Sequence, residues 1–162
     1  QKNQLTFEGI KEIYVLKGPG SFTGLRVGVT VANTLAYLNN AQLYELSTFE
    51  YWHEFTDLPV LIFAGKGGVY LSENPTKEPE IINLDQLNST LESKKIKEVT
   101  GSISEEQKSM LAPIKFQNII PDFAKIIAKI AEQNKLKSVK LVKPLYIKQP
   151  AITPSKKLIC ST

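Results

Sequence analysis

The sequence predicts an α/β fold with a mixed sheet. Segments typical of strands alternate with segments typical of helices, and a glycine-rich turn joins two apolar strands. The first strand is predicted at Ile10–Leu16, which ends in four apolar residues and leads into the turn Gly18-Pro19-Gly20. A helix follows at Phe22–Asn39, because its apolar residues recur at helical spacing over a length that exceeds a normal strand.

The rest of the chain continues this alternation. A strand is predicted at Gln42–Leu46, and Ser47 caps the next helix with Glu50 placed for a capping box. Leu58–Ala64 and Val69–Ser72 form a predicted hairpin, which argues against a purely parallel sheet. The remaining predicted elements are a strand at Glu80–Asn83, a helix capped by Asp85 that ends near Ser93, a short strand at Glu98–Thr100 that ends at Gly101, a helix at Ser104–Met110, an amphipathic helix at Pro121–Gln133, and an extended segment at Pro144–Ile147 followed by a loose tail.

Composition places the chain among globular proteins. It has 162 residues, of which 42% are hydrophobic, and no apolar run reaches the roughly 18 residues of a membrane helix. The chain opens with polar residues, so no signal peptide is predicted, and the single Cys160 excludes an internal disulfide. We therefore expect a soluble protein of the cytoplasm without membrane contact.

The net charge of +4 is mild, and the lysines fall into two clusters. One cluster spans 94–97 and the other spans 135–143. A nucleic-acid surface and an ordinary solvated surface both fit such clusters. The lysines lack the interleaved aromatic residues that binders of single strands usually supply, which favours the solvated surface.

The helix predicted at Phe22–Asn39 carries two apolar faces. A helix that lies on a sheet needs only one, so the second face contacts either another helix of this chain or another protein. Gly24 and Gly28 lie one turn apart and leave a flat area where a second helix can approach closely. One face comprises Leu25, Gly28, Val29, Ala32 and Ala36; the other comprises Val27, Val31, Thr34 and Leu38; the polar stripe comprises Arg26, Thr30, Asn33 and Tyr37.

Catalytic groups are scarce. A strand followed by a glycine turn and the start of a helix can bind phosphate. The P-loop motif is absent because no lysine follows Gly24, and the dinucleotide-binding motif is absent because Thr23 stands where it needs glycine. His53 is the only histidine, so a paired-histidine metal site is excluded, and no G-x-S-x-G motif is present. We expect no catalytic residue, no metal ligand and no cofactor.

Gly18–Ala32 (GPGSFTGLRVGVTVA) resembles the signature segment of the TsaB family, which belongs to the actin-like ATPase superfamily. The similarity continues with LSTF at 46–49 and VY at 69–70, and it ends with PLYIK at 144–148. The resemblance implies an actin-like, ribonuclease H-like fold with a mixed sheet flanked by helices. It assigns residues 1–48 to the remainder of an N-terminal lobe, 49–143 to a smaller second lobe, and 144–162 to an extended segment and tail.

The resemblance also implies a role in tRNA modification. TsaB proteins act in the formation of N6-threonylcarbamoyladenosine at position 37 of tRNAs that read codons starting with A. They form a heterodimer with the catalytic subunit TsaD, and the ATPase TsaE joins a larger assembly. The expected protein is then a non-catalytic subunit that self-associates when alone and meets tRNA only indirectly. The alternative is a nucleotide-binding, phosphotransferase-like enzyme of the same superfamily.

Two sets of site residues follow from the resemblance. The signature loop comprises Gly18, Pro19, Gly20, Ser21, Phe22, Thr23 and Gly24, and the helix face toward the partner comprises Gly24, Leu25, Val27, Gly28, Val31, Thr34 and Leu38. Two departures from the family pattern stand out. Relatives begin with a strand that carries an "AIDT"-like motif, so N-terminal strands are expected to be missing from this chain. Ala64–Gly68 stands where relatives usually show "DAR-x-x-E".

Overall fold

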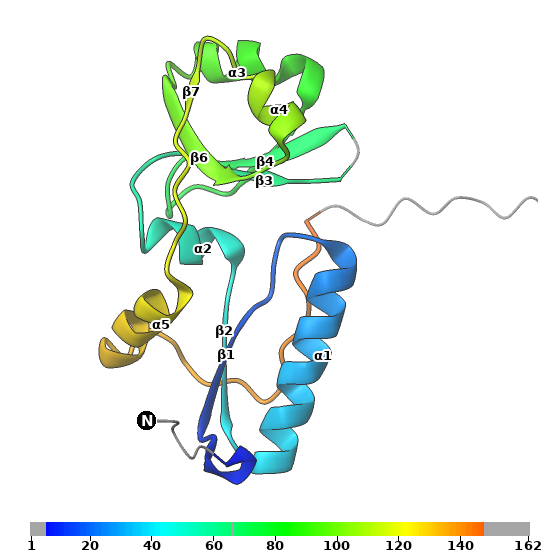
Figure 1. The fold of residues 1–162 in the computed structure, drawn as a ribbon, viewed down its shortest axis with the longest axis vertical. Helices are drawn as coiled ribbons and strands as arrows, with labels where there is room; N and C mark the ends of the chain where they lie inside the picture. The colour runs from blue at the N-terminus through cyan, green and yellow to red at the C-terminus, as the bar shows by residue number, and fades with distance from the viewer. Residues whose placement is uncertain (1–5, 66, 148–162) are drawn as a thin grey trace, which may run out of the picture.

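The computed structural model describes residues 6–65 and 67–147, which form two sheets with helices beside and between them (Figure 1). The smaller sheet pairs two strands, and the larger one has the order β5-β4-β3-β6-β7. The strands are β1 (Glu12–Leu16), β2 (Gln42–Leu46), β3 (Val60–Phe63), β4 (Gly68–Ser72), β5 (Glu80–Asn83), β6 (Glu98–Ser102) and β7 (Lys115–Phe116). The helices are α1 (Phe22–Asn39), α2 (Thr48–His53), α3 (Leu87–Ser93), α4 (Glu105–Ser109) and α5 (Phe123–Glu132), with short 3-10 turns at Phe7–Gly9 and Leu84–Gln86.

Strands β1 and β2 pair in parallel, and α1 is the crossover between them. The helix packs on this sheet through Val29, Ala32 and Ala36, which form a core with Leu43 and neighbouring residues. Small alanine side chains let the helix lie close to the strands. The amide of Gly24 donates to Ser21 Oγ at the N-terminus, and Asn40 takes the left-handed conformation at the C-terminus, so both predicted ends of the helix are confirmed.

The segment 136–147 adds an outer layer beside β2 and α1. The amide of Val139 donates to the Leu43 carbonyl at 2.8 Å, and that of Leu145 donates to the Lys17 carbonyl at 2.7 Å. Asn33 on α1 holds the segment from the other side, because its side chain donates to the Val142 carbonyl and accepts from the Val142 amide. The segment therefore runs along α1 over much of its length, as Figure 1 shows in orange.

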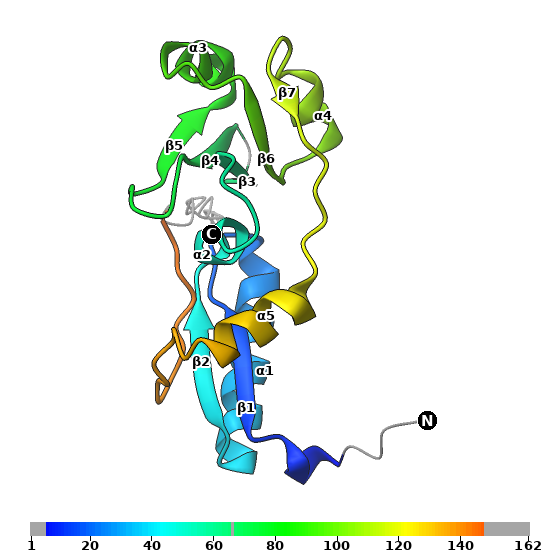
Figure 2. The same cartoon turned by 90° about the vertical axis from the view of Figure 1, so that its left-hand side faces the viewer.

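Helix α2 lies between the two sheets (Figure 1), and α5 crosses the face of the β1–β2 pair that is opposite α1 (Figure 2). One core joins Leu46 at the end of β2 with Trp52 of α2, Val60 of β3 and Ile126 of α5. The predicted capping box of α2 is confirmed, with Ser47 and the N3 residue of the helix bonded reciprocally. The predicted division into lobes at 1–48 and 49–143 stays a prediction.

Most predicted elements are confirmed within a few residues, and three details differ. Asp85 does not cap a helix; it lies inside the 3-10 turn, and Gln86 precedes α3. Strand β6 does not end at Gly101 but runs on to Ser102, because Gly101 and Ser102 still pair with Leu61 and Ile62 of β3. The two-residue strand β7 was not predicted, since its pairing with β6 leaves no periodic signal in so short a run.

Replacing Gly101 with alanine should destabilise the protein. A Cβ atom at this position would lie 1.9 Å from the Leu61 carbonyl oxygen, and the backbone conformation disfavours any side chain. We expect Gly101→Ala to lower the free energy of unfolding by about 2 kcal/mol or more in urea denaturation. Gly28→Ala is the control: its Cβ meets nothing within 4 Å, so stability should stay or rise. Equal stability of the two variants would contradict this account.

Candidate functional site

The outer face of α1 is an apolar surface without cover from the described part of the chain. Val27, Val31 and Leu38 are 59%, 49% and 63% exposed, and Thr34 between them is exposed as well. The opposite side of the helix packs on β1 and β2, so one helix presents apolar residues in two directions. Covering these three side chains in a complex would contribute on the order of 3–5 kcal/mol before the cost of association.

The glycines on this helix leave room for a neighbour. A Cβ added to Gly28 would meet nothing within 4 Å, and one added to Gly24 would meet only Ser21. Leu25 differs from the rest of the predicted face. It is half-buried, and its methyl groups lie against Gly18 and Gly20, so it packs on the chain's own loop.

The glycine loop sets the start of α1. Gly18 has a φ of 108°, and a Cβ there would lie 2.7 Å from a Leu25 methyl group and 3.0 Å from the Leu145 carbonyl. Only glycine fits this combination of conformation and space. Thr48 fixes the loop from α2, since its amide donates to the Gly18 carbonyl and its hydroxyl donates to the Pro19 carbonyl.

The second half of the loop faces outward. Gly20, Ser21, Phe22, Thr23 and Gly24 are exposed, whereas Gly18 and Pro19 are buried. The Phe22 ring lies 5.0 Å from that of Tyr146, and the Arg26 guanidinium lies 5.2 Å over the Phe22 ring. Tyr146 belongs to the PLYIK motif, so the two ends of the TsaB resemblance meet here. Lys148 of that motif lies outside the described residues, as does Cys160.

His53 is held in the structure by a buried hydroxyl. Its Nε2 lies 2.9 Å from Ser72 Oγ, and Ser72 is 2% exposed. Burial lowers the pKa of the imidazole. Their hydrogen bond joins α2 to β4, where both residues also line the cavity beside the loop that follows Ser72.

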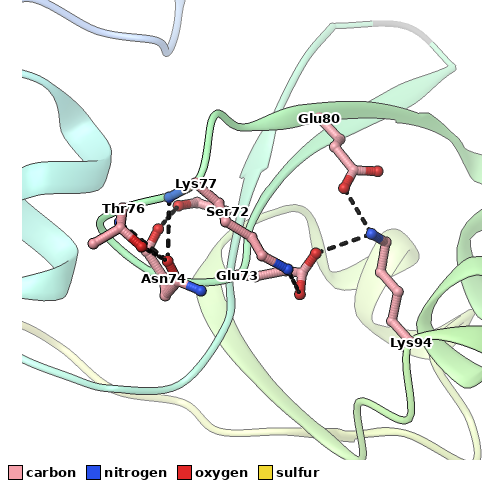
Figure 3. A network of polar contacts seen from close by, with 7 residues as sticks. All are labelled: Ser72, Glu73, Asn74, Thr76, Lys77, Glu80 and Lys94. Carbon is pink, nitrogen blue, oxygen red and sulfur yellow. Dashed lines mark hydrogen bonds and ion pairs between the residues drawn. The ribbon is translucent and has the colours of Figure 1, made fainter.

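The loop that follows Ser72 is fixed by polar contacts (Figure 3). The Asn74 side-chain oxygen accepts from the amides of Thr76 and Lys77. Lys94 bridges Glu73 at 2.9 Å and Glu80 at 2.7 Å, which neutralises one member of the first lysine cluster. A cavity of about 320 Å³ beside this loop is lined by Lys17, Lys77, Glu50 and Glu78 among others, so its charges balance and favour no charged ligand.

Within residues 6–65 and 67–147, no group of three or more His, Cys, Asp and Glu side chains is placed to hold a metal ion. No helix of the described residues has the length and apolar character needed to cross a membrane.

Comparisons with known proteins assign the chain to a family. A family model described as "TsaD: tRNA N6-adenosine threonylcarbamoyltransferase" matches residues 1–149. The chain belongs to this family. The TsaB resemblance is also confirmed: the tRNA threonylcarbamoyladenosine biosynthesis protein TsaB of Bacillus subtilis is 44% identical over 43 residues, which are 26% of this chain and 19% of that protein.

Another curated protein and two solved structures are also similar to this TsaD-family chain. The "Uncharacterized protein MG208 homolog" of Mycoplasma pneumoniae is 43% identical over 49 residues, or 30% of this chain. The matched stretches span about a quarter or less of these curated relatives (25% and 19%). Among solved structures, YeaZ from Pseudomonas aeruginosa has a TM-score of 0.61 at 14% identity, covering 88% of this chain and 77% of that one.

A second Pseudomonas aeruginosa structure, described as an uncharacterized protein with similarity to peptidase YEAZ, has a TM-score of 0.62 at 14% identity over 89% of this chain and 76% of that one. The likeness confirms the predicted actin-like fold class with a mixed sheet flanked by helices.

Three contacts that position this surface did not follow from the sequence. Asn33 belongs to the predicted polar stripe, yet it binds the Val142 backbone rather than solvent. Thr48 and Tyr146 hold the glycine loop from segments that are distant in sequence. No local pattern indicates such pairings; the sequence predicted only that Pro144–Ile147 is extended.

Stability should fall as the pH is lowered below neutrality. The pKa of His53 is lowered in the folded state. As the pH falls through about 6.5, the imidazole is therefore protonated in the unfolded chain before it is protonated in the folded one. We expect the free energy of unfolding to decrease between pH 7.5 and 5.5, by less than about 1.4 kcal/mol per pH unit for one proton. Urea denaturation at several pH values measures it.

The matched variant for this measurement is His53→Gln, which keeps a hydrogen-bonding group beside Ser72 and removes the titration. Glu54, Glu73 and Glu98 have lowered pKa values, so their protonation affects the free energy of unfolding only at more acidic pH. A slope between pH 7.5 and 5.5 that persists in His53→Gln would show that another group titrates.

Proposed function

We propose that this protein is a non-catalytic subunit that binds and activates a TsaD-type catalytic subunit in the formation of N6-threonylcarbamoyladenosine in tRNA. The observation that carries the proposal is the exposed apolar face of α1, formed by Val27, Val31, Thr34 and Leu38. Family membership supports the pathway, and the name of the Bacillus subtilis relative supports the type of subunit.

A helix of the partner fits this face best. The face runs along a single helix. Beside it, Gly24 and Gly28 have no Cβ atom that would keep a neighbouring helix at a distance. An irregular loop would leave backbone groups unpaired against Val27 and Val31. We therefore place a helix of the catalytic subunit alongside α1, and the same face would join two copies of this chain when that subunit is absent.

A supporting role rather than catalysis agrees with the side chains that are present. The single histidine packs against a buried serine, and the charged groups of the nearby cavity balance one another. The substrate and the chemistry would then belong to the partner. A TsaE-type ATPase is proposed as a further member of the assembly, and a cytoplasmic location stays a prediction.

Filling the flat area on α1 should prevent assembly. We expect Gly28→Leu to abolish co-purification with a TsaD-type subunit, because the added side chain occupies the space of the partner helix. The fold should persist, since leucine is a better helix former than glycine by roughly 0.8 kcal/mol. Thr30→Leu places the same side chain on the polar stripe and should co-purify normally. Normal co-purification of Gly28→Leu, with its circular dichroism unchanged, would count against the proposed interface.

A further inference from the structure

The polar stripe of α1 lies beside the segment 136–147, and the proposed partner contact leaves both unused. Asn33 joins the two through its paired hydrogen bonds with Val142. The stripe is turned about 100° around the helix from the apolar face of Val27 and Val31. The two surfaces therefore point in different directions from the helix axis and meet at Thr34.

The segment shows a three-residue repeat of burial. Leu136, Val139, Val142 and Leu145 are buried or half-buried, whereas Lys137, Lys140 and Lys143 are exposed. The backbone bends at Lys140, so Lys137 and Lys143 lie on either side of the bend. We call Lys137, Lys140 and Lys143 the lysine ridge.

The positive charge of the ridge is uncompensated. None of its three ammonium groups forms an ion pair within the part of the chain that the structure describes, unlike Lys135, which pairs with Glu54 at 2.6 Å. The segments 22–39 and 133–147 contain no aspartate or glutamate at all. Three lysines without an ion pair, on two segments that carry no carboxylate, favour a polyanion.

An aromatic groove accompanies the ridge. A hollow of about 590 Å³ lies between the C-terminal half of α1 and residues 139–141, and its lining includes Lys140, Asn40 and Tyr37. Tyr37 is 86% exposed, so one face of its ring is open to a planar ligand. Lysines that track a backbone beside an aromatic ring on which a base stacks are the parts of a single-strand nucleic-acid site.

We propose that the lysine ridge binds the phosphate backbone of tRNA and that Tyr37 stacks on an unpaired base. The choice of tRNA as the RNA rests on the proposed function. The lack of aromatic residues among the lysines favours a solvated surface, and the TsaB resemblance implies only indirect contact with tRNA. The fold supplies that aromatic residue from α1. An acidic protein segment is the competing occupant, but the open Tyr37 ring beside Lys140 favours RNA.

The test measures binding of an unmodified tRNA transcript to this chain alone by fluorescence anisotropy over a series of salt concentrations. We expect Lys137→Gln/Lys140→Gln/Lys143→Gln to weaken binding about tenfold or more, and to reduce the slope of log K against log salt by about 2, since each lost phosphate contact removes about 0.7. The control Lys95→Gln/Lys97→Gln/Lys125→Gln removes the same charge from exposed positions elsewhere and should bind nearly as wild type.

Substitution of Tyr37 provides a second, independent test. Tyr37→Ala should weaken tRNA binding roughly fivefold or more without changing the salt slope, and Tyr37→Phe should restore it, because stacking needs only the ring. Equal losses in the ridge and control variants would indicate a non-specific charge effect and overturn the proposal. So would a ridge variant that binds tRNA normally but loses co-purification with the TsaD-type subunit, which would assign the ridge to a protein. The Gly28→Leu result does not bear on these readings, so the two proposals fail separately.

Discussion

Helix α1 lies on a sheet of two strands and carries more apolar surface than that sheet can cover. Val29, Ala32 and Ala36 fill the contact with β1 and β2, while Val27, Val31 and Leu38 remain in solvent on the far side. Exposed apolar residues that are scattered singly are ordinary, but a continuous face on one helix marks an interaction site. The proposed assembly with another subunit depends on this imbalance.

The other parts of the N-terminal region serve to hold that helix in place. The buried Gly18 and Pro19 fix its start, with Thr48 bonded to both carbonyls. Asn33 and the Phe22–Tyr146 contact tie its polar stripe to the segment 136–147. Because α1 is held on its buried face and along its polar stripe, the apolar face and the lysine ridge keep fixed positions relative to each other.

Local patterns predict much of this architecture. The bounds of α1, β2 and β5 match the structure because capping residues, helical spacing and short apolar runs are local signals. Contacts between distant segments were not predictable, since the partner of Asn33 lies 109 positions away and the neighbour of Tyr37 is a lysine beyond residue 136. Helical geometry predicted the second apolar face of Val27, Val31 and Leu38 but left open whether this chain covers it, whereas the turn of Leu25 toward the loop required the position of Gly18.

The account is tested most directly by measuring whether a partner covers the outer face of α1. Two variants are made in a Cys160→Ser background. Val31→Cys places a single thiol on the apolar face, and Lys140→Cys places a single thiol on the lysine ridge. Maleimide labelling is followed with and without a TsaD-type subunit. The account predicts that the subunit strongly slows labelling at position 31 and leaves position 140 unchanged. Labelling of position 31 at the same rate in the stable complex would show that the partner binds elsewhere.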